Sequence, residues 1–125
     1  MESILIVDDD INLCTILSEE LKEIGYTTHF VTNADGAFEY LHSDNHVDLV
    51  LLDLVMPDKD GFFVLKKANE EELDVKIIVL TAYADVKSAI EAAKLGAADF
   101  VNKPYDLDEL IIAMRKVLQK EEHEN

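Results

Sequence analysis

Carboxylate side chains follow two strongly apolar segments of the chain, at the point where each segment ends. Asp8 and Asp9 follow the segment Ser3–Val7, and Asp53 follows the segment Asp48–Leu52. Burying an unpaired carboxylate is costly, so proteins usually pair such a group or bind a metal ion with it. Carboxylate oxygens with room for water suit Mg²⁺ or Mn²⁺, and a carboxylate beside such an ion can attack a phosphoryl group. These residues therefore predict an acidic site that handles phosphate.

A hydroxyl group and an ammonium group follow two further apolar segments. Thr81 comes directly after Lys76–Leu80, and Lys103 comes shortly after Ala98–Val101. During phosphoryl transfer, a lysine and a hydroxyl donor can stabilise the charge on the phosphoryl oxygens. Each residue alone is a weak signal, because a threonine after a strand is usually a turn residue and a lysine before a proline is usually on the surface. Their shared position at the ends of segments, together with the carboxylates, predicts one site.

Five short segments rich in apolar and β-branched residues alternate with segments in which apolar residues recur at helical spacing. Each apolar segment is typical of a strand, and the alternation predicts a parallel sheet with helices on both faces. The expected fold class is α/β: one doubly wound, flavodoxin-like, five-stranded parallel sheet of order 2-1-3-4-5, with its ligand site between the first and third strands. The predicted strands are Ser3–Val7, Thr27–Val31, Asp48–Leu52, Lys76–Leu80 and Ala98–Val101.

The composition limits the classes of protein that need to be considered. A chain of 125 residues fits one domain, which we place at residues 1–120, with a polar tail or the start of a linker at residues 121–125. The net charge of -16 predicts no direct binding to nucleic acid. The chain has no apolar run of membrane-spanning length and no basic leader, so we expect no membrane association and a cytoplasmic location. The single cysteine, Cys14, is expected to be a small buried hydrophobe.

Four segments of the chain resemble the receiver domain of bacterial two-component response regulators. The resemblance runs from Met1 to about Gln119 and is specific, because the motifs agree in both order and spacing. It implies a phosphorylation-activated signalling domain, not an enzyme with a turnover of its own, that takes a phosphoryl group onto Asp53 from a sensor histidine kinase or a phosphotransfer protein. Phosphorylation from small donors and self-dephosphorylation are also implied. The four segments are ILIVDDD, DLVLLDLVMPDKDG, KIIVLTAYAD and GAADFVNKPYDLDEL.

The resemblance also implies a metal site and names its ligands. Asp8, Asp9 and Asp53 are expected to hold Mg²⁺, with the backbone carbonyl of Val55 as a further ligand. Mn²⁺ is expected as a substitute for Mg²⁺. Bulk at Val55 and at Tyr83 would restrict the access of water to the phosphoryl group, which predicts a longer-lived phosphorylated state.

The same resemblance assigns the groups that respond to phosphate. Thr81 and Lys103 are expected to contact the phosphoryl group, and the peptide bond from Lys103 to Pro104 is expected to be cis. Phe100 matches the aromatic residue that moves inward when the hydroxyl group shifts toward phosphate. The fourth helix, the fifth strand and the fifth helix are then expected to change their exposed face, which would control an output partner or domain.

The nature of the output is left open by the sequence. The segment from Thr81 to Leu110 is similar to the receivers of transcription regulators that carry an ATPase and a DNA-binding module downstream. The chain could equally act as a stand-alone receiver in a relay. A homodimer through the face formed by the fourth helix, the fifth strand and the fifth helix is a further expectation.

Two alternative functions use the same acidic residues. ILIVDDDIN is similar to the motif of haloacid-dehalogenase-like phosphatases, with Asp8 as nucleophile and Asp10 as acid/base, but Asn12 departs from that motif. A calcium loop of the EF-hand type starting at Asp8 is set aside, because Leu13 stands where such a loop requires glycine. We expect Asp10 to cap the helix that follows it.

Overall fold

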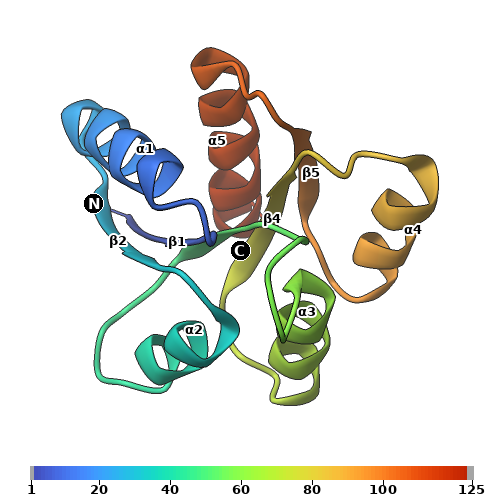
Figure 1. Cartoon of the computed structure of the whole chain (residues 1–125). Coiled ribbons are helices and arrows are strands. Elements are labelled where there is room, and N and C mark those ends of the chain that lie inside the picture. Colours follow the sequence, from blue (N-terminus) through green and yellow to red (C-terminus); the bar gives the residue numbers. More distant parts are fainter. Residues whose placement is uncertain (1, 124–125) are drawn as a thin grey trace.

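The computed structural model describes residues 2–123 and shows strands and helices in strict alternation (Figure 1). The strands are β1 (Ser3–Val7), β2 (Thr27–Val31), β3 (Leu49–Leu52), β4 (Lys76–Thr81) and β5 (Asp99–Asn102). The helices are α1 (Ile11–Ile24), α2 (Ala34–Leu41), α3 (Gly61–Glu70), α4 (Val86–Lys94) and α5 (Leu107–His123). The boundary predicted at residue 120 falls inside α5, and residues 124–125 of the predicted tail lie outside the described residues.

The strands form one parallel sheet of order β2-β1-β3-β4-β5, which confirms the predicted fold class and strand order. Three strands have bounds slightly different from those predicted. β3 begins one residue later than expected, at Leu49, and β5 is shifted by one residue, to Asp99–Asn102. Thr81 is the last residue of β4 and not the first residue after it, because it still pairs with Asn102 of β5. The parallel ladder between β4 and β5 therefore extends one residue beyond the apolar run of each strand.

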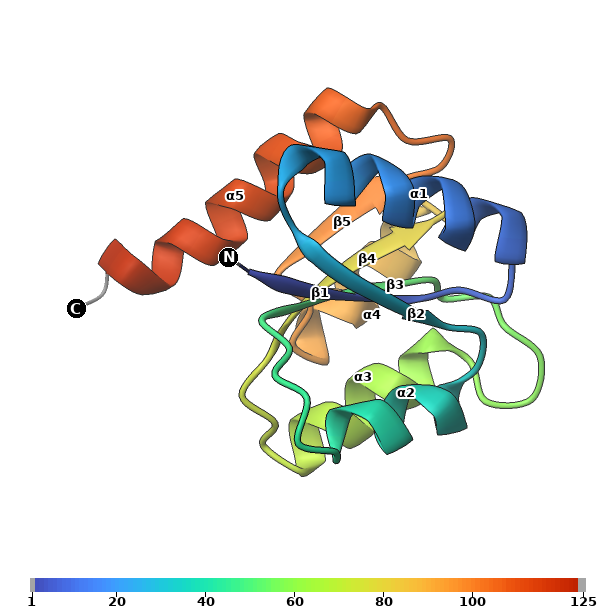
Figure 2. The same cartoon turned by 90° about the vertical axis from the view of Figure 1, so that its left-hand side faces the viewer.

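Helices cover both faces of the sheet, as Figure 2 shows, with α1 and α5 on one side and α2 and α3 on the other. Alternate residues along the central strands point to opposite faces, so Ile4 and Ile6 pack in the core under α1 and α5, while Leu5 and Val7 pack in the core under α2 and α3. Cys14 is fully buried in the first of these cores, as expected. Among the described residues, no helix has the length and apolarity of a membrane span.

Side-chain caps fix where the helices begin. Asp10, Asn33, Asp60 and Asp85 each accept a hydrogen bond from a backbone N–H near the start of the helix that follows. In α1 the Asp10 carboxylate accepts from the Leu13 N–H at 3.1 Å, which confirms the predicted cap. Such a bond satisfies one of the free donors at a helix start. In α1 this cap sets the helix start only two residues after Asp9, next to the acidic end of β1.

Candidate functional site

The ends of β1 and β3 bring two carboxylates side by side. Val7 and Leu52 are register partners, and the Asp53 N–H donates to the Val7 carbonyl oxygen at 3.0 Å. Asp8 and Asp53, the next residue on each strand, therefore leave the sheet at neighbouring points. The chain passes from β1 to β2 on one side of β1, and then returns to place β3 on the other side of β1. The direction in which strands are added to the sheet therefore reverses between β1 and β3. Ligands of doubly wound sheets bind at such a point.

Three carboxylates meet at this edge. Asp8, Asp9 and Asp53 each offer a carboxylate oxygen, and these oxygens lie within 4.8 Å of one another. Asp8 is 2% exposed and Asp53 is 7% exposed, whereas Asp9 faces solvent. Three like charges this close repel strongly unless a cation lies among them. A set of hard oxygen donors, open to water on one side, fits Mg²⁺ or Mn²⁺.

Lys103 reaches this cluster from the loop between β5 and α5. Its Nζ atom lies 2.6 Å from Asp8 Oδ2 and 3.3 Å from Asp53 Oδ2, and its side chain is only 17% exposed. Burial raises the pKa of the Asp8 carboxyl, although the hydrogen bonds from Lys103 and from the Asp10 backbone act in the opposite direction. Burial lowers the pKa of Lys103, but the hydrogen bond and charge of Asp8, joined by Asp53, outweigh that effect and raise it. Lys103 therefore stays an ammonium ion that links the two buried carboxylates.

Thr81 connects β4 to the same loop. It is fully buried, its carbonyl oxygen accepts from the Lys103 N–H at 2.9 Å, and its hydroxyl oxygen accepts from the Tyr83 N–H at 3.2 Å. The peptide bond between Lys103 and Pro104 is cis. Thr81 therefore holds the backbone from which the Lys103 side chain crosses to the carboxylates.

Gly61 supports Asp53 from behind, a role that the sequence did not reveal. A Cβ atom at Gly61 would lie 2.3 Å from the Asp53 carbonyl oxygen and 2.6 Å from the Leu54 Cα atom. The Gly61 N–H also donates to the Leu54 carbonyl oxygen at 3.0 Å. The start of α3 is thus pressed against the backbone that carries Asp53, and only glycine fits there. Turn-forming residues surround Gly61 in the sequence, as in Pro57–Gly61, but they give no sign of this contact.

Val55 and Tyr83 are exposed residues that follow Asp53 and Thr81 by two positions. The Val55 N–H donates to Asp53 Oδ1 at 3.3 Å, and the Val55 side chain is 49% exposed. Tyr83 is 61% exposed. Phe100 lies farther away, partly buried on β5 and packed against the core under α2 and α3. The structure therefore gathers Asp8, Asp9, Asp53 and Lys103 at one point and leaves Phe100 outside it.

Asp10 does not join this cluster in the manner expected for a phosphatase acid/base. Its carboxylate accepts the Leu13 N–H at the start of α1, and Asp9 is the residue that completes the set with Asp8 and Asp53. The arrangement offers no support for Asp10 as a proton donor beside Asp8.

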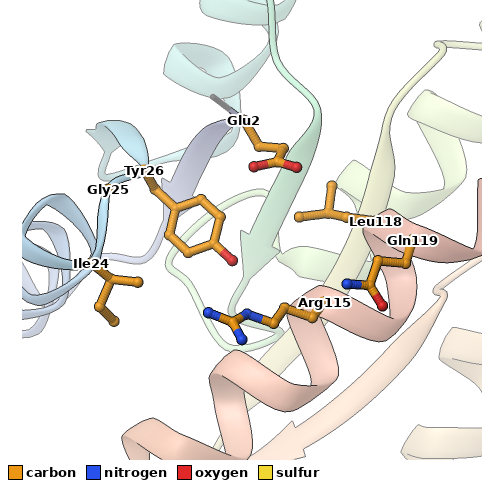
Figure 3. Close-up of a pocket in the computed structure, with 7 residues that line it drawn as sticks. All are labelled: Glu2, Ile24, Gly25, Tyr26, Arg115, Leu118 and Gln119. Carbon is orange, nitrogen blue, oxygen red and sulfur yellow. The ribbon is translucent and has the colours of Figure 1, made fainter. Parts of the chain in front are cut away.

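A separate cavity of about 270 Å³ lies at the opposite end of the sheet (Figure 3). It is lined by residues just before β1 and β2 and by α5, and Figure 3 shows the side chains of Glu2, Tyr26 and Arg115 around the same space. Glu2 is the one acidic residue among the described residues that line it. This cavity therefore lacks the paired carboxylates on which phosphoryl chemistry would depend.

Comparison with known proteins agrees with the geometry of the site. Residues 4–115 match the family described as the response regulator receiver domain. The chain is similar to the regulatory protein AtoC of Escherichia coli K12, with 43% identity over 116 residues. This match covers 93% of the chain but only 25% of AtoC, so the chain spans about a quarter of the length of that relative.

Solved structures show the same fold along nearly the whole chain. The response regulator protein TrrA of Thermotoga maritima, crystallised in complex with Mg²⁺ and BeF, is 36% identical, with a TM-score of 0.84 over 94% of this chain and 100% of that one. A CheY-like response regulator receiver domain protein of Methanospirillum hungatei JF-1 is 26% identical, with a TM-score of 0.92 over 100% of this chain and 99% of that one.

Proposed function

Because the chain belongs to the response regulator receiver family, whose members are phosphorylation-activated signalling domains of two-component systems, we propose that Asp53 is its phosphoacceptor. The observation that carries this proposal is the cluster of Asp8, Asp9 and Asp53 with the Lys103 ammonium at the ends of β1 and β3. Asp53 is nearly buried, and two of its neighbours in the site, Asp9 and Val55, are exposed.

The transfer step uses groups that are already in place. An Asp53 carboxylate oxygen attacks the phosphorus of a phosphohistidine, the new O–P bond forms as the P–N bond breaks, and the imidazole leaves with the electron pair of that bond. Lys103, 3.3 Å from Asp53, offsets the negative charge of the phosphoryl oxygens. The Thr81 hydroxyl group, which accepts from the Tyr83 N–H and keeps its own proton to donate, is proposed to bind a further phosphoryl oxygen.

Mg²⁺ binding is a general property of the family. In this chain we assign Asp8, Asp9, Asp53 and the backbone carbonyl of Val55 as the ligands, and Mn²⁺ as a substitute. The bound ion supplies positive charge against the phosphoryl oxygens. The Asp8 carboxylate is held by the backbone, since the Asp10 N–H donates to Asp8 Oδ1 at 2.9 Å, and the helix cap at Asp10 follows directly.

The partner and output belong to the same proposal. A sensor histidine kinase or a phosphotransfer protein supplies the phosphoryl group, and small phosphodonors serve in its place. The chain then catalyses the hydrolysis of its own acyl phosphate. The face formed by α4, β5 and α5 passes the signal to an output domain or to a second copy of the chain. Similarity to the transcriptional regulatory protein ZraR of Escherichia coli K12 favours an output that regulates transcription.

Mapping the acyl phosphate tests the proposal. After incubation with acetyl phosphate and Mg²⁺, peptide mass mapping is expected to place the phosphoryl group on Asp53, and Asp53→Asn is expected to remain unlabelled. Asp58→Asn is the matched control, because Asp58 is exposed and its left-handed backbone conformation (φ 66°) suits asparagine. A label on Asp8 would overturn the proposal in favour of the phosphatase reading.

A further inference from the structure

The site draws its charged groups from three loops that are far apart in the sequence, and Asp53 comes from the loop between β3 and α3. The carboxylates of Asp8 and Asp9 precede α1, whereas Lys103 lies in the loop between β5 and α5. The backbone of Lys103 is held to β4 through Thr81, but its side chain must cross to β1 to reach Asp8. The position of this loop relative to β1, and to α1 which follows Asp10, therefore affects how easily the ammonium group reaches Asp8.

A direct link joins the same loop to α1. Two residues beyond Lys103, the Tyr105 hydroxyl group donates to Glu20 Oε1 at 2.5 Å. Glu20 lies on α1, 85 positions earlier in the chain, and Figure 2 shows α1 and α5 on the same side of the sheet. Both side chains are partly buried, and the Tyr105 ring packs against the core under α1 and α5. Burial and the Glu20 carboxylate raise the pKa of Tyr105, so the hydroxyl group keeps its proton and remains the donor.

The space beside this link is not closely packed. A cavity of about 370 Å³ lies between Leu13 of α1 and the loop residues Lys103, Pro104 and Tyr105. Its walls are almost wholly apolar. Among the described residues, the bond from Tyr105 to Glu20 is the only side-chain hydrogen bond between this loop and α1. The hydrogen bond between Tyr105 and Glu20 is therefore well placed to fix the separation of the two segments.

We propose that Tyr105 and Glu20 form a positioning pair that holds the loop between β5 and α5 against α1 and so keeps Lys103 within reach of Asp8 and Asp53. The inference rests on the proposed role of Asp53 as phosphoacceptor. Neither residue touches the reacting atoms. Their effect passes through the position of the Lys103 ammonium group, on which stabilisation of the transferred phosphoryl group depends.

The test measures phosphorylation by acetyl phosphate in the full chain, together with Mg²⁺ affinity by calorimetry. Tyr105→Phe and Glu20→Ala each remove the hydrogen bond and are expected to lower the phosphorylation rate about three- to tenfold. Mg²⁺ affinity is expected to stay the same or to rise slightly, because the carboxylates keep their places while a competing ammonium group loosens its hold. Glu20→Gln keeps an acceptor oxygen for the tyrosine hydroxyl group and is expected to retain a rate within about twofold of wild type.

Two matched controls separate this effect from general changes. Tyr40→Phe removes the hydroxyl group of another partly buried tyrosine, on the far side of the sheet, and Glu19→Ala removes a neighbouring exposed charge from α1. Both are expected to behave as wild type.

Each remaining outcome has one meaning. Wild-type rates in Tyr105→Phe and Glu20→Ala would overturn the positioning role. Loss of Mg²⁺ affinity in parallel with the rate would also overturn it, because that result means α1 and its acidic loop have shifted as a whole. Failure of the wild-type chain itself to label Asp53 would instead overturn the proposed function.

Discussion

The central strands are much more deeply buried than the residues of α4. All four residues of β3 are buried, as are the last four of β1. In α4 Ala92 is the one buried residue, while Val86 is 75% exposed and Ile90 is 51% exposed. Segments with few buried apolar contacts open or shift at low free-energy cost. The carboxylates therefore lie at the ends of tightly packed strands, whereas the proposed output face includes a helix with little buried surface.

Core truncation gives the largest expected contrast between the two regions. Leu51→Ala in β3 removes a side chain that is 1% exposed, and we expect it to lower the free energy of unfolding by about 2–5 kcal/mol. Ile90→Ala in α4 is expected to change it by no more than about 0.5 kcal/mol, because half of that side chain is already in water. Urea unfolding followed by circular dichroism measures both values. Equal losses in the two variants would contradict the contrast.

Gly61 tests whether the packing behind Asp53 matters for its chemistry. Gly61→Ala places a methyl group against the backbone of Asp53 and Leu54, and we expect it to cost about 1–3 kcal/mol of stability and to slow phosphorylation of Asp53. Gly36→Ala is the control, because its Cβ would meet only side-chain atoms of Asn33 and Val31, at 3.2 Å. Unfolding and acetyl phosphate labelling should separate the two variants, and a Gly61→Ala protein with normal labelling would argue against the supporting contact.

Tyr83 tests the weakly packed segment between β4 and α4, next to Thr81. Tyr83→Ala removes a bulky, 61% exposed side chain beside Thr81, and we expect loss of phosphate from Asp53 to accelerate about two- to fivefold because water enters more easily. Val86→Ala is an exposed control at the start of α4. The decay of the acyl phosphate after removal of donor measures the rate, and an unchanged lifetime in Tyr83→Ala would remove this role.

The reactivity of the Cys14 thiol tests how tightly α1 is packed on the central strands, and here we expect the smallest effect. Burial raises the pKa of this thiol from 9.0 to about 11, so in the folded chain at pH 8 it should react with thiol reagents only as fast as the protein opens. Between pH 9 and 11 the thiol ionises in the unfolded chain before it ionises in the folded one, so folding stability should fall over this range. Rapid labelling of the native protein at pH 8 would show that α1 is not held tightly to the sheet.

Much of this architecture follows from patterns that are local in the sequence. Alternating strand and helix signals indicate a doubly wound parallel sheet. The common strand order of five-stranded sheets of this kind then predicts that Asp8 and Asp53 lie together. The cap at Asp10 and the burial of Cys14 are likewise local and are confirmed. The predicted ends of the strands are less accurate, because Thr81 is polar and yet still pairs within the sheet.

Contacts between distant, irregular segments could not be predicted in the same way. The hydrogen bond from Tyr105 to Glu20 joins two residues that the sequence places in different elements. Taken separately, Tyr105 is an aromatic residue in a loop and Glu20 is an acidic residue on a helix. From the sequence, Gly61 is interpreted as a turn residue only. Its close approach to Asp53 depends on how α3 packs and not on its neighbours in sequence. Such contacts leave no periodic signal, so only the folded structure reveals them.

The strand order also has a consequence for how the chain folds. Because β1 lies between β2 and β3, residues 3–52 contain a complete three-stranded unit, and β4 and β5 then extend it along one edge only. Loop closure is least costly within that early unit, so we expect the folding nucleus to form around β1, with β5 joining late. Truncations in β1 should accordingly slow refolding, while truncations in β5 should mainly hasten unfolding. The segment that delivers Lys103 is then the last to arrive, and the phosphoryl site is completed only when folding is nearly over.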